Sequence, residues 1–253
     1  MKIALSGKGG TGKTTIAAGL GILLSQKGNR VVLIDADPDS NLQTTLGYQG
    51  EITPLTELKS LIQERTGANQ TGGIVFKLNP KVDDIPEKFF ARYSDRILIG
   101  ILGTIRGGGL GCACPENAFL KALLRHLILG RDDVVILDME AGVEHLGRGT
   151  TQGIDWLLIV SEPGRKSIET TLRIHKLGMQ LGISKIRVIC NKIKDTVEEN
   201  YLKQNLDGLE IIGYIPYSQE VQHAELTGEK FWDKPSKIME SLNIILTRLL
   251  EEK

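Results

Sequence analysis

Residues 7–14 of the chain, GKGGTGKT, have the residue types and spacing of a phosphate-binding loop. The pattern G-x-x-x-x-G-K-[ST] follows an apolar segment typical of a strand and precedes a helical one, which is the context that it requires. Its glycines let backbone N–H groups surround phosphate oxygens at the positive end of the helix. Lys13 can then reach the β- and γ-phosphates of a nucleotide, and Thr14 can hold Mg²⁺. The residues expected to bind nucleotide here are Gly9, Gly10, Thr11, Gly12, Lys13, Thr14 and Thr15.

A second segment, 134-VVILDMEAG-142, fits the other half of a nucleotide site. Four apolar residues followed by Asp138 form a Walker B pattern, in which the carboxylate holds a water bound to Mg²⁺. Gly142 would allow the backbone to move when the γ-phosphate arrives or leaves. We therefore expect a Mg²⁺-dependent nucleotide hydrolase.

Cys112 and Cys114 are two of the three cysteines of the chain, and they stand one residue apart in 107-GGGLGCACPENAFLKALLRHL-127. A structural zinc site needs four nitrogen or sulfur ligands. The third cysteine, Cys190, lies in a predicted buried strand, where a free cysteine is most often a small core residue. One chain therefore supplies half of a tetrahedral site, and a symmetric dimer would supply four thiolates from two such segments.

The residues around this cysteine pair favour metal binding. Pro115 suits the first position of a helix, which places Cys114 at or near the N-cap, where the pKa of a thiol is lowered. The thiolate is the form that binds metal. Glycines at 107–109 and 111 allow the loop to change shape. Two inert loop cysteines and a redox pair are the alternatives, although a disulfide across one intervening residue closes a strained ring.

Length and composition exclude several classes of function. The chain has 253 residues, with 31 basic and 31 acidic side chains. A net charge of zero argues against nucleic acid as the main partner, because phosphate binding usually leaves a basic excess. No apolar run approaches the roughly 20 residues of a membrane-spanning helix, and the N-terminus lacks the features of a signal peptide. We expect a cytoplasmic protein without a disulfide framework that binds neither nucleic acid nor membrane.

The elements that position these residues alternate along the chain. Short apolar runs predict strands covered on both faces, at 2–6, 31–35, 96–100, 134–138, 156–160, 187–191 and 210–215. Helical periods lie between them, at 13–27, 54–65, 115–129, 164–181, 196–205, 218–226 and 235–251. This alternation predicts a mostly parallel, doubly wound α/β sheet with helices on both faces, in a single domain over residues 1–253. The least regular part is about 48–94, with an exposed loop at 66–73, and the amphipathic C-terminal helix should pack on the domain.

Lys8 gives the P-loop the sequence KGGTGKT, the deviant Walker A of a class of dimeric ATPases. Over nearly its whole length the chain resembles that class, which includes the nitrogenase iron protein, the division-site and plasmid-partition ATPases and the arsenite-pump ATPase. The resemblance implies the P-loop NTPase fold, a face-to-face homodimer and ATP as the nucleotide. It also implies that Lys8 reaches the partner's ATP and stabilises developing charge as an arginine finger does. A solvated surface lysine is the alternative.

The same resemblance assigns roles in a first switch segment, 35-DADPDSNLQ-43. Asp37 falls 24 residues after Lys13 and matches the carboxylate that orients or deprotonates the attacking water. Asp35, Asp39 and Asn41 would contribute to Mg²⁺-bound waters or to the dimer contact. Asp35 or Asp39 could equally be a plain loop carboxylate.

Two further segments resemble the base-binding elements of the class. Asn191, in VICNK, has an amide that can bond the edge of adenine. The segment 213-GYIPYSQEV-221, which contains Pro216, resembles the loop that wraps the base. ATP is favoured over GTP, because the NKxD element of related GTPases would need Asp at position 194, where this chain has Lys194.

Among these ATPases the chain resembles the CooC family, the nickel-insertion ATPases of carbon monoxide dehydrogenase maturation. The resemblance rests on the deviant Walker A, the Cys-x-Cys ahead of a helix, and 138-DMEAGVEHLGRGT-150. It implies one Ni²⁺ or Zn²⁺ per homodimer at Cys112 and Cys114 of both chains, with carbon monoxide dehydrogenase as the client metalloenzyme. An iron–sulfur cluster carrier or reductase ATPase is one alternative, and a partition or positioning ATPase is another. His126 and His145 are not assigned as ligands.

Overall fold

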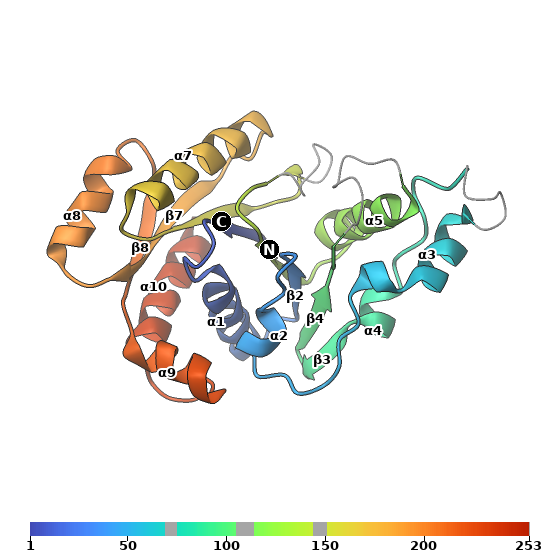
Figure 1. Ribbon diagram of the computed structural model, residues 1–253, viewed down its shortest axis with the longest axis horizontal. Coiled ribbons are helices and arrows are strands. Elements are labelled where there is room, and N and C mark those ends of the chain that lie inside the picture. Colours follow the sequence, from blue (N-terminus) through green and yellow to red (C-terminus); the bar gives the residue numbers. More distant parts are fainter. Residues whose placement is uncertain (69–74, 105–113, 144–150, 253) are drawn as a thin grey trace.

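The described residues form an eight-stranded sheet through the middle of the molecule, with helices on both of its faces (Figure 1). The computed structural model describes residues 1–68, 75–104, 114–143 and 151–252. In spatial order the strands are β3-β4-β2-β5-β1-β6-β7-β8, and each neighbouring pair is parallel except β3–β4. The mostly parallel doubly wound sheet expected from the sequence is confirmed. The strands are β1 Lys2–Gly7, β2 Val31–Ala36, β3 Ala91–Ser94, β4 Ile97–Ile101, β5 Val134–Met139, β6 Trp156–Ser161, β7 Ile186–Ile193 and β8 Ile211–Pro216.

The helices connect these strands and lie close to the ranges expected from the helical periods. They are α1 Lys13–Gln26, α2 Leu42–Thr45, the 3₁₀ helix η1 Leu55–Glu57, α3 Lys59–Thr66, α4 Ile85–Phe89, α5 Pro115–Leu129, α7 Arg165–Gln180, α8 Thr196–Asn205, α9 Gln219–Thr227 and α10 Lys237–Glu251. No described helix is both long enough and apolar enough to cross a membrane.

The structure differs from expectation mainly in the irregular segment 48–94. The edge strand β3 was not predicted, because its residues alternate between half-buried and exposed positions and form no apolar run. The helix expected at 54–65 is divided into η1 and α3 at Leu58, whose ψ of 55° is not helical. The short helices α2 and α4 contain too few residues to show a helical period.

The exposed loop expected at 66–73 does not include Thr66. Thr66 is fully buried at the end of α3, where its hydroxyl donates to the carbonyl oxygen of Ile62 at 2.6 Å. A threonine can satisfy its hydroxyl within its own helix in this way, so its polarity did not signal a loop. Residues 69–73 lie outside the described part of the chain.

Each face of the sheet is covered by its own set of helices. Ile3 and Leu5 of β1 point to the face that carries α1 and α10, and Ala4 points to the face that carries α5 and α7. All six residues of β1 are buried, as the continuous apolar run predicted. The amphipathic helix α10 packs its apolar side on β8 and α1, which confirms that prediction.

The strands that carry the expected site residues all end at the same edge of the sheet. β1 runs into the P-loop, and its neighbour β5 carries Asp138 opposite Leu5. β2 lies beside β5 and places Asp35 opposite Asp138. In open parallel sheets ligands bind at the carboxyl ends of the strands, where the strand order changes direction. The topology therefore brings segments from distant parts of the sequence to one edge.

Gly7 at the end of β1 is paired with Val160 of β6 and leaves no room for a side chain, so it provides a test of this packing. A Cβ atom at Gly7 would lie 2.3 Å from the carbonyl oxygen of Val160, and the φ of Gly7 is 156°. Gly7→Ala should therefore lower the free energy of unfolding by about 2–5 kcal/mol, from steric overlap and backbone strain. Denaturant unfolding measures this change. Gly9→Ala is the matched control, because its Cβ would meet nothing within 4 Å. Equal stability of both variants would contradict the close approach.

Candidate nucleotide site

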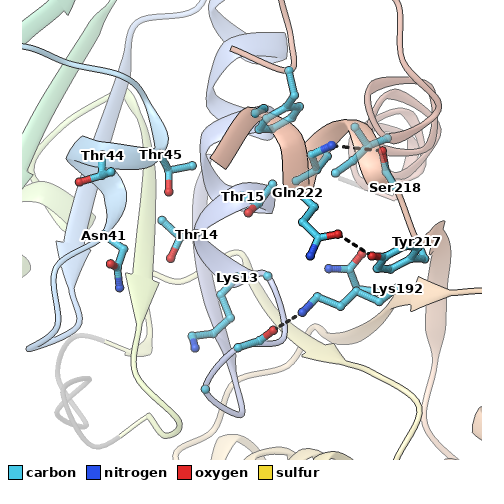
Figure 2. A pocket seen from close by; sticks show the side chains of 18 of the residues that line it. Lys13, Thr14, Thr15, Asn41, Thr44, Thr45, Lys192, Tyr217, Ser218 and Gln222 are labelled. Carbon is cyan, nitrogen blue, oxygen red and sulfur yellow. Dashed lines mark hydrogen bonds between the residues drawn. The ribbon is translucent and has the colours of Figure 1, made fainter. Parts of the chain in front are cut away.

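A cavity of about 710 Å³ opens above the P-loop, between α1 and α2 on one side and the ends of β7 and β8 on the other. Figure 2 shows Lys13, Thr14 and Thr15 facing this cavity from α1, with Tyr217 and Gln222 across from them. The lining includes most of the residues expected to bind nucleotide: Gly9, Gly10, Gly12, Lys13, Thr14, Thr15, Asp37, Asn191 and Pro216. Lys8, Thr11 and Asp138, which were also expected at the site, lie next to the cavity rather than in its lining.

The P-loop closes on itself through the carbonyl of Lys8. The backbone N–H and the side-chain hydroxyl of Thr11 both donate to this oxygen, at 3.3 and 2.8 Å, and the Lys13 ammonium lies 3.5 Å from it. Gly12 caps helix α1 in the left-handed conformation, with a φ of 91°. Thr11 is fully buried, so its side chain shapes the loop, and any contact with phosphate would come from its backbone.

Asp138 has the properties expected of a carboxylate next to a metal ion. Its side chain is buried, and its Oδ1 has no hydrogen-bond partner among the described residues. Burial raises the pKa of Asp138 to about 7, while a hydrogen bond from Thr14 and the charge of Lys13 oppose this rise. A buried, unbonded carboxylate oxygen beside a threonine hydroxyl fits Mg²⁺, which prefers oxygen ligands and retains several waters.

The first switch segment is organised by one buried carboxylate. Asp35 is fully buried and accepts hydrogen bonds from the Ser40 hydroxyl at 2.8 Å and from the backbone N–H groups of Leu42 and Asp37, at 2.9 and 3.1 Å. Burial raises the pKa of Asp35, and these donors oppose the rise. Of the two roles that the sequence left open for Asp35, the structure favours that of a carboxylate that holds its own loop together. Asp37 is held by this network at the cavity wall.

Asn191 lies at the cavity, and its amide nitrogen contacts the P-loop. Its Nδ2 donates to the backbone carbonyl of Thr11 at 2.7 Å, in a buried bond. The sequence assigned this amide to the edge of adenine. In the structure its nitrogen supports the P-loop from behind, which leaves the amide oxygen as the group for a base.

Lys192 and Glu162 are residues of the site that sequence reasoning missed. The Lys192 ammonium donates to the carbonyl of Gly10 at 2.5 Å, as Figure 2 shows. Lys192 also has a φ of 61°, the one positive φ among the described non-glycine residues, a conformation that costs about 1–2 kcal/mol. Glu162, which follows β6, lies 3.7 Å from Lys192 and 3.7 Å from Lys8. The positive φ of Lys192 is the structural feature that marks this residue as part of the site, and the sequence gives no sign of it.

The far end of the cavity is suited to a flat, partly apolar group. Pro216 and Tyr217 line it, and the Tyr217 hydroxyl donates to the Gln222 side-chain oxygen at 2.8 Å (Figure 2). Val221 and Phe231 add apolar surface. This end matches the segment that was expected to surround the base.

The predicted metal ligands are only partly within the described chain. Cys112, in 105–113, lies outside the described residues, and so does His145, in 144–150. Cys114 is the N-cap of α5, directly before Pro115, as predicted. Cys190 is fully buried in β7, and burial raises its pKa to about 12, which confirms it as an inert core thiol.

The described residues outside the cavity contain no alternative metal centre. No three His, Cys, Asp or Glu side chains gather among them in a way that could hold an ion. His126 lies in the last turn of α5, with its Nε2 buried and not hydrogen-bonded to any described group. Its position on the helix after the cysteine pair is as expected, at the opposite end of α5 from Cys114.

Comparisons with known proteins agree with this geometry. The CobQ/CobB/MinD/ParA nucleotide binding domain family matches residues 2–231. The chain is 41% identical to the carbon monoxide dehydrogenase accessory protein CooC of Rhodospirillum rubrum, over 99% of this chain and 97% of that protein. It is 47% identical to an uncharacterized ATP-binding protein of Methanocaldococcus jannaschii, over 90% of both chains. The structure of the MinD cell division protein of Aquifex aeolicus is similar in fold, with a TM-score of 0.70 and 24% identity, over 100% of this chain and 98% of that one.

Removing the Lys192 ammonium tests whether it shapes the P-loop. Lys192→Met should raise the Kd for ADP about tenfold, because a charged hydrogen bond to the loop carbonyl is lost. Isothermal titration measures the affinity, and thermal unfolding should change little because Lys192 is half-exposed. Lys192→Arg keeps the charge and should restore part of the affinity. Lys203→Met, which removes an exposed cation on α8, is the control. Wild-type affinity in Lys192→Met would show that the contact has no role in binding.

Proposed function

The chain belongs to the CobQ/CobB/MinD/ParA family of nucleotide-binding P-loop ATPases, and from this we propose that it is a Mg²⁺-dependent metallochaperone of one domain per chain. In this proposal a homodimer carries one metal ion, Ni²⁺ or Zn²⁺, between its subunits. ATP binding and hydrolysis then accompany nickel insertion into carbon monoxide dehydrogenase. The observation that carries the proposal is the 41% identity to CooC over 99% of the chain, together with Cys114 at the start of α5.

The start of α5 has the chemistry that a thiolate ligand needs. The helix is 15 residues long, and its N-terminal dipole lowers the pKa of a thiol placed at the N-cap. Cys114 occupies that position, and Cys112 precedes it by two residues. Two such pairs, one from each subunit, would provide four soft sulfur ligands, which suit a transferable ion of the nickel or zinc type. In this proposal the metal is a transferred substrate that is bound at the dimer interface.

The ATP site has the groups that hydrolysis requires. Thr14 and Asp138 would hold Mg²⁺ and one of its waters, and this ion would offset charge on the phosphates. Lys13 faces the cavity from the start of α1 and would contact the β- and γ-phosphates. Asp37 lies at the cavity wall, where it would orient the attacking water.

Lys8 would complete the site of the partner subunit. Here it is paired with Glu162 at 3.7 Å, and the two side chains are 37% and 25% exposed. An ion pair this exposed contributes only about 0.2–1 kcal/mol, so that exchanging Glu162 for the partner's phosphates costs little. Metal and ATP would both favour the closed dimer, and by linkage each would tighten the binding of the other. Hydrolysis would remove the contact for Lys8 and release the metal.

Two alternative functions, an iron–sulfur carrier and a positioning ATPase, predict different experimental results. An iron–sulfur carrier would also use four cysteinates from two chains, and reconstitution would then give four irons per dimer. A positioning ATPase would act on membrane or DNA, and MinD of Thermotoga maritima is 29% identical over 89% of this chain. The higher identity to CooC and the packing of the apolar side of α10 against β8 favour the metallochaperone.

Substituting one cysteine tests the shared metal site. Cys112→Ser should reduce the metal content from one ion per dimer to none that survives gel filtration, because a site with two thiolates instead of four binds far more weakly. Elemental analysis with the mass in solution measures this ratio. Cys190→Ala, which alters the buried cysteine of β7, should keep the metal. A Cys112→Ser protein that still holds one ion per dimer would exclude the shared site.

Mixing two inactive variants tests the role of Lys8 across the dimer. Lys8→Ala and Asp37→Ala should each lack ATPase activity when alone. In a mixed dimer the Asp37→Ala chain still offers Lys8 to the intact Asp37 site of its partner. An equal mixture should therefore recover roughly a quarter of the wild-type rate per chain, in a steady-state phosphate-release assay. If the mixture stays inactive while mixed dimers form, Lys8 does not act in trans.

A further inference from the structure

Ser6 connects the strand before the P-loop with the segment after Asp138. It is fully buried, and its hydroxyl oxygen lies 2.9 Å from the carbonyl oxygen of Glu140 and 2.8 Å from that of Gly142. The Gly142 N–H donates to the same hydroxyl at 3.0 Å and to the Glu140 carbonyl at 2.7 Å. Residues 140–142 thus form a tight turn whose polar backbone groups converge on one serine side chain.

The register of the sheet explains why Ser6 meets this turn. Leu5 is paired with Asp138 on β5, and Ser6 lies one residue further along, where the pairing with β5 has ended. On its other side Ser6 is still paired with Ile159 of β6. The backbone of Ser6 is therefore fixed to the sheet, while its side chain holds a segment that has left the sheet. Gly7, the next residue, begins the P-loop.

The hydroxyl of Ser6 has one proton and two carbonyl acceptors. It can donate to only one of them at a time, and it can accept from the Gly142 N–H in either case. The Glu140 carbonyl already accepts from Gly142, so the proton is needed most at the Gly142 carbonyl. If the turn moves, a small rotation of the hydroxyl group lets Ser6 donate its hydrogen bond to the backbone carbonyl of Glu140 instead. The contact thus allows two arrangements, which is what a switch segment requires.

We propose that Ser6 is a positioning residue that fastens the segment after Asp138 to the P-loop strand and allows it two discrete positions. Through this contact, the binding of phosphates at the P-loop is coupled to the position of the backbone that follows Asp138. Losing the hydroxyl would leave the buried Gly142 carbonyl without its donor, which favours other positions of the turn. The expected consequence falls on the rate of hydrolysis and leaves the affinity for nucleotide nearly unchanged. The proposal rests on the ATPase activity alone and is independent of metal delivery.

Kinetics and hydrogen exchange of Ser6→Ala test this role. The kcat should fall about three- to tenfold, the range that corresponds to one hydrogen bond, while the KM for ATP stays within about twofold. Amide exchange in a peptide covering 138–143 should become several-fold faster without nucleotide. Protection of the P-loop peptide by ADP should be unchanged.

Two further variants separate positioning from general stability. Ser6→Cys keeps the side-chain volume with a weaker donor, so its kcat should lie between those of wild type and Ser6→Ala, and it replaces Ser6→Ala if that variant does not fold. Ser161→Ala removes another fully buried serine, at the end of β6, whose hydroxyl contacts Ser167 and not the turn. It should keep kcat and the exchange rate at 138–143. Unchanged kcat and exchange in Ser6→Ala, or equal effects in Ser161→Ala, would overturn the proposal.

Discussion

The site depends on one constraint: a loop that turns its N–H groups toward a phosphate must turn carbonyl oxygens away from it. A carbonyl that folding removes from water then needs a donor from the protein, because an unbonded buried acceptor costs about 1–3 kcal/mol. The chain provides donors for three carbonyls of the loop, at positions 8, 10 and 11. Thr11 and Lys13 serve the carbonyl of Lys8, Lys192 serves Gly10, and Asn191 serves Thr11. Protein groups thus hold the shape of the P-loop, which reduces the cost of ordering it when nucleotide binds.

The same constraint explains why the strained residue is at the end of β7. Asn191 and Lys192 are adjacent, yet both must reach the P-loop, and successive side chains of a regular strand point to opposite faces. A positive φ at Lys192 breaks the alternation, and it coincides with an irregular register between β7 and β8 at this point. The cost of this conformation, about 1–2 kcal/mol, is offset by the hydrogen bonds of Asn191 and Lys192 to the P-loop. The backbone conformation of Lys192 is therefore explained by the contacts that the end of β7 makes with the P-loop.

The sequence predicted the elements better than the contacts between them. The P-loop, the strands 2–6 and 134–138 and the cap at Cys114 all follow from local patterns, and local patterns determine local structure. Asn191 lies at the cavity as expected, but its contact with the P-loop was not predicted, because one residue type can bond a base or a backbone carbonyl equally well. Glu162 and Ser6 carried no local signal, since the partners of their side chains, Lys8 and Lys192 for Glu162 and the 140–142 turn for Ser6, come from other segments of the chain. β3 lacked the apolar run that marks a strand, because it lies at the edge of the sheet.

The path between the nucleotide and the cysteines also follows from packing. Helix α5 begins next to Cys114 and ends a few residues before β5, the strand that carries Asp138. Its buried side, which includes Phe119 and Leu123, is packed into one core with the sheet. Close-packed interiors have low compressibility and transmit strain, so a displacement of the strand would be passed on to the helix. In the proposed homodimer, a change at the nucleotide would therefore reach the cysteines as a movement of one subunit against the other. Such a movement requires a contact across the interface that exists only when nucleotide is bound. The proposed contact of Lys8 with the nucleotide of the partner subunit would be of this kind.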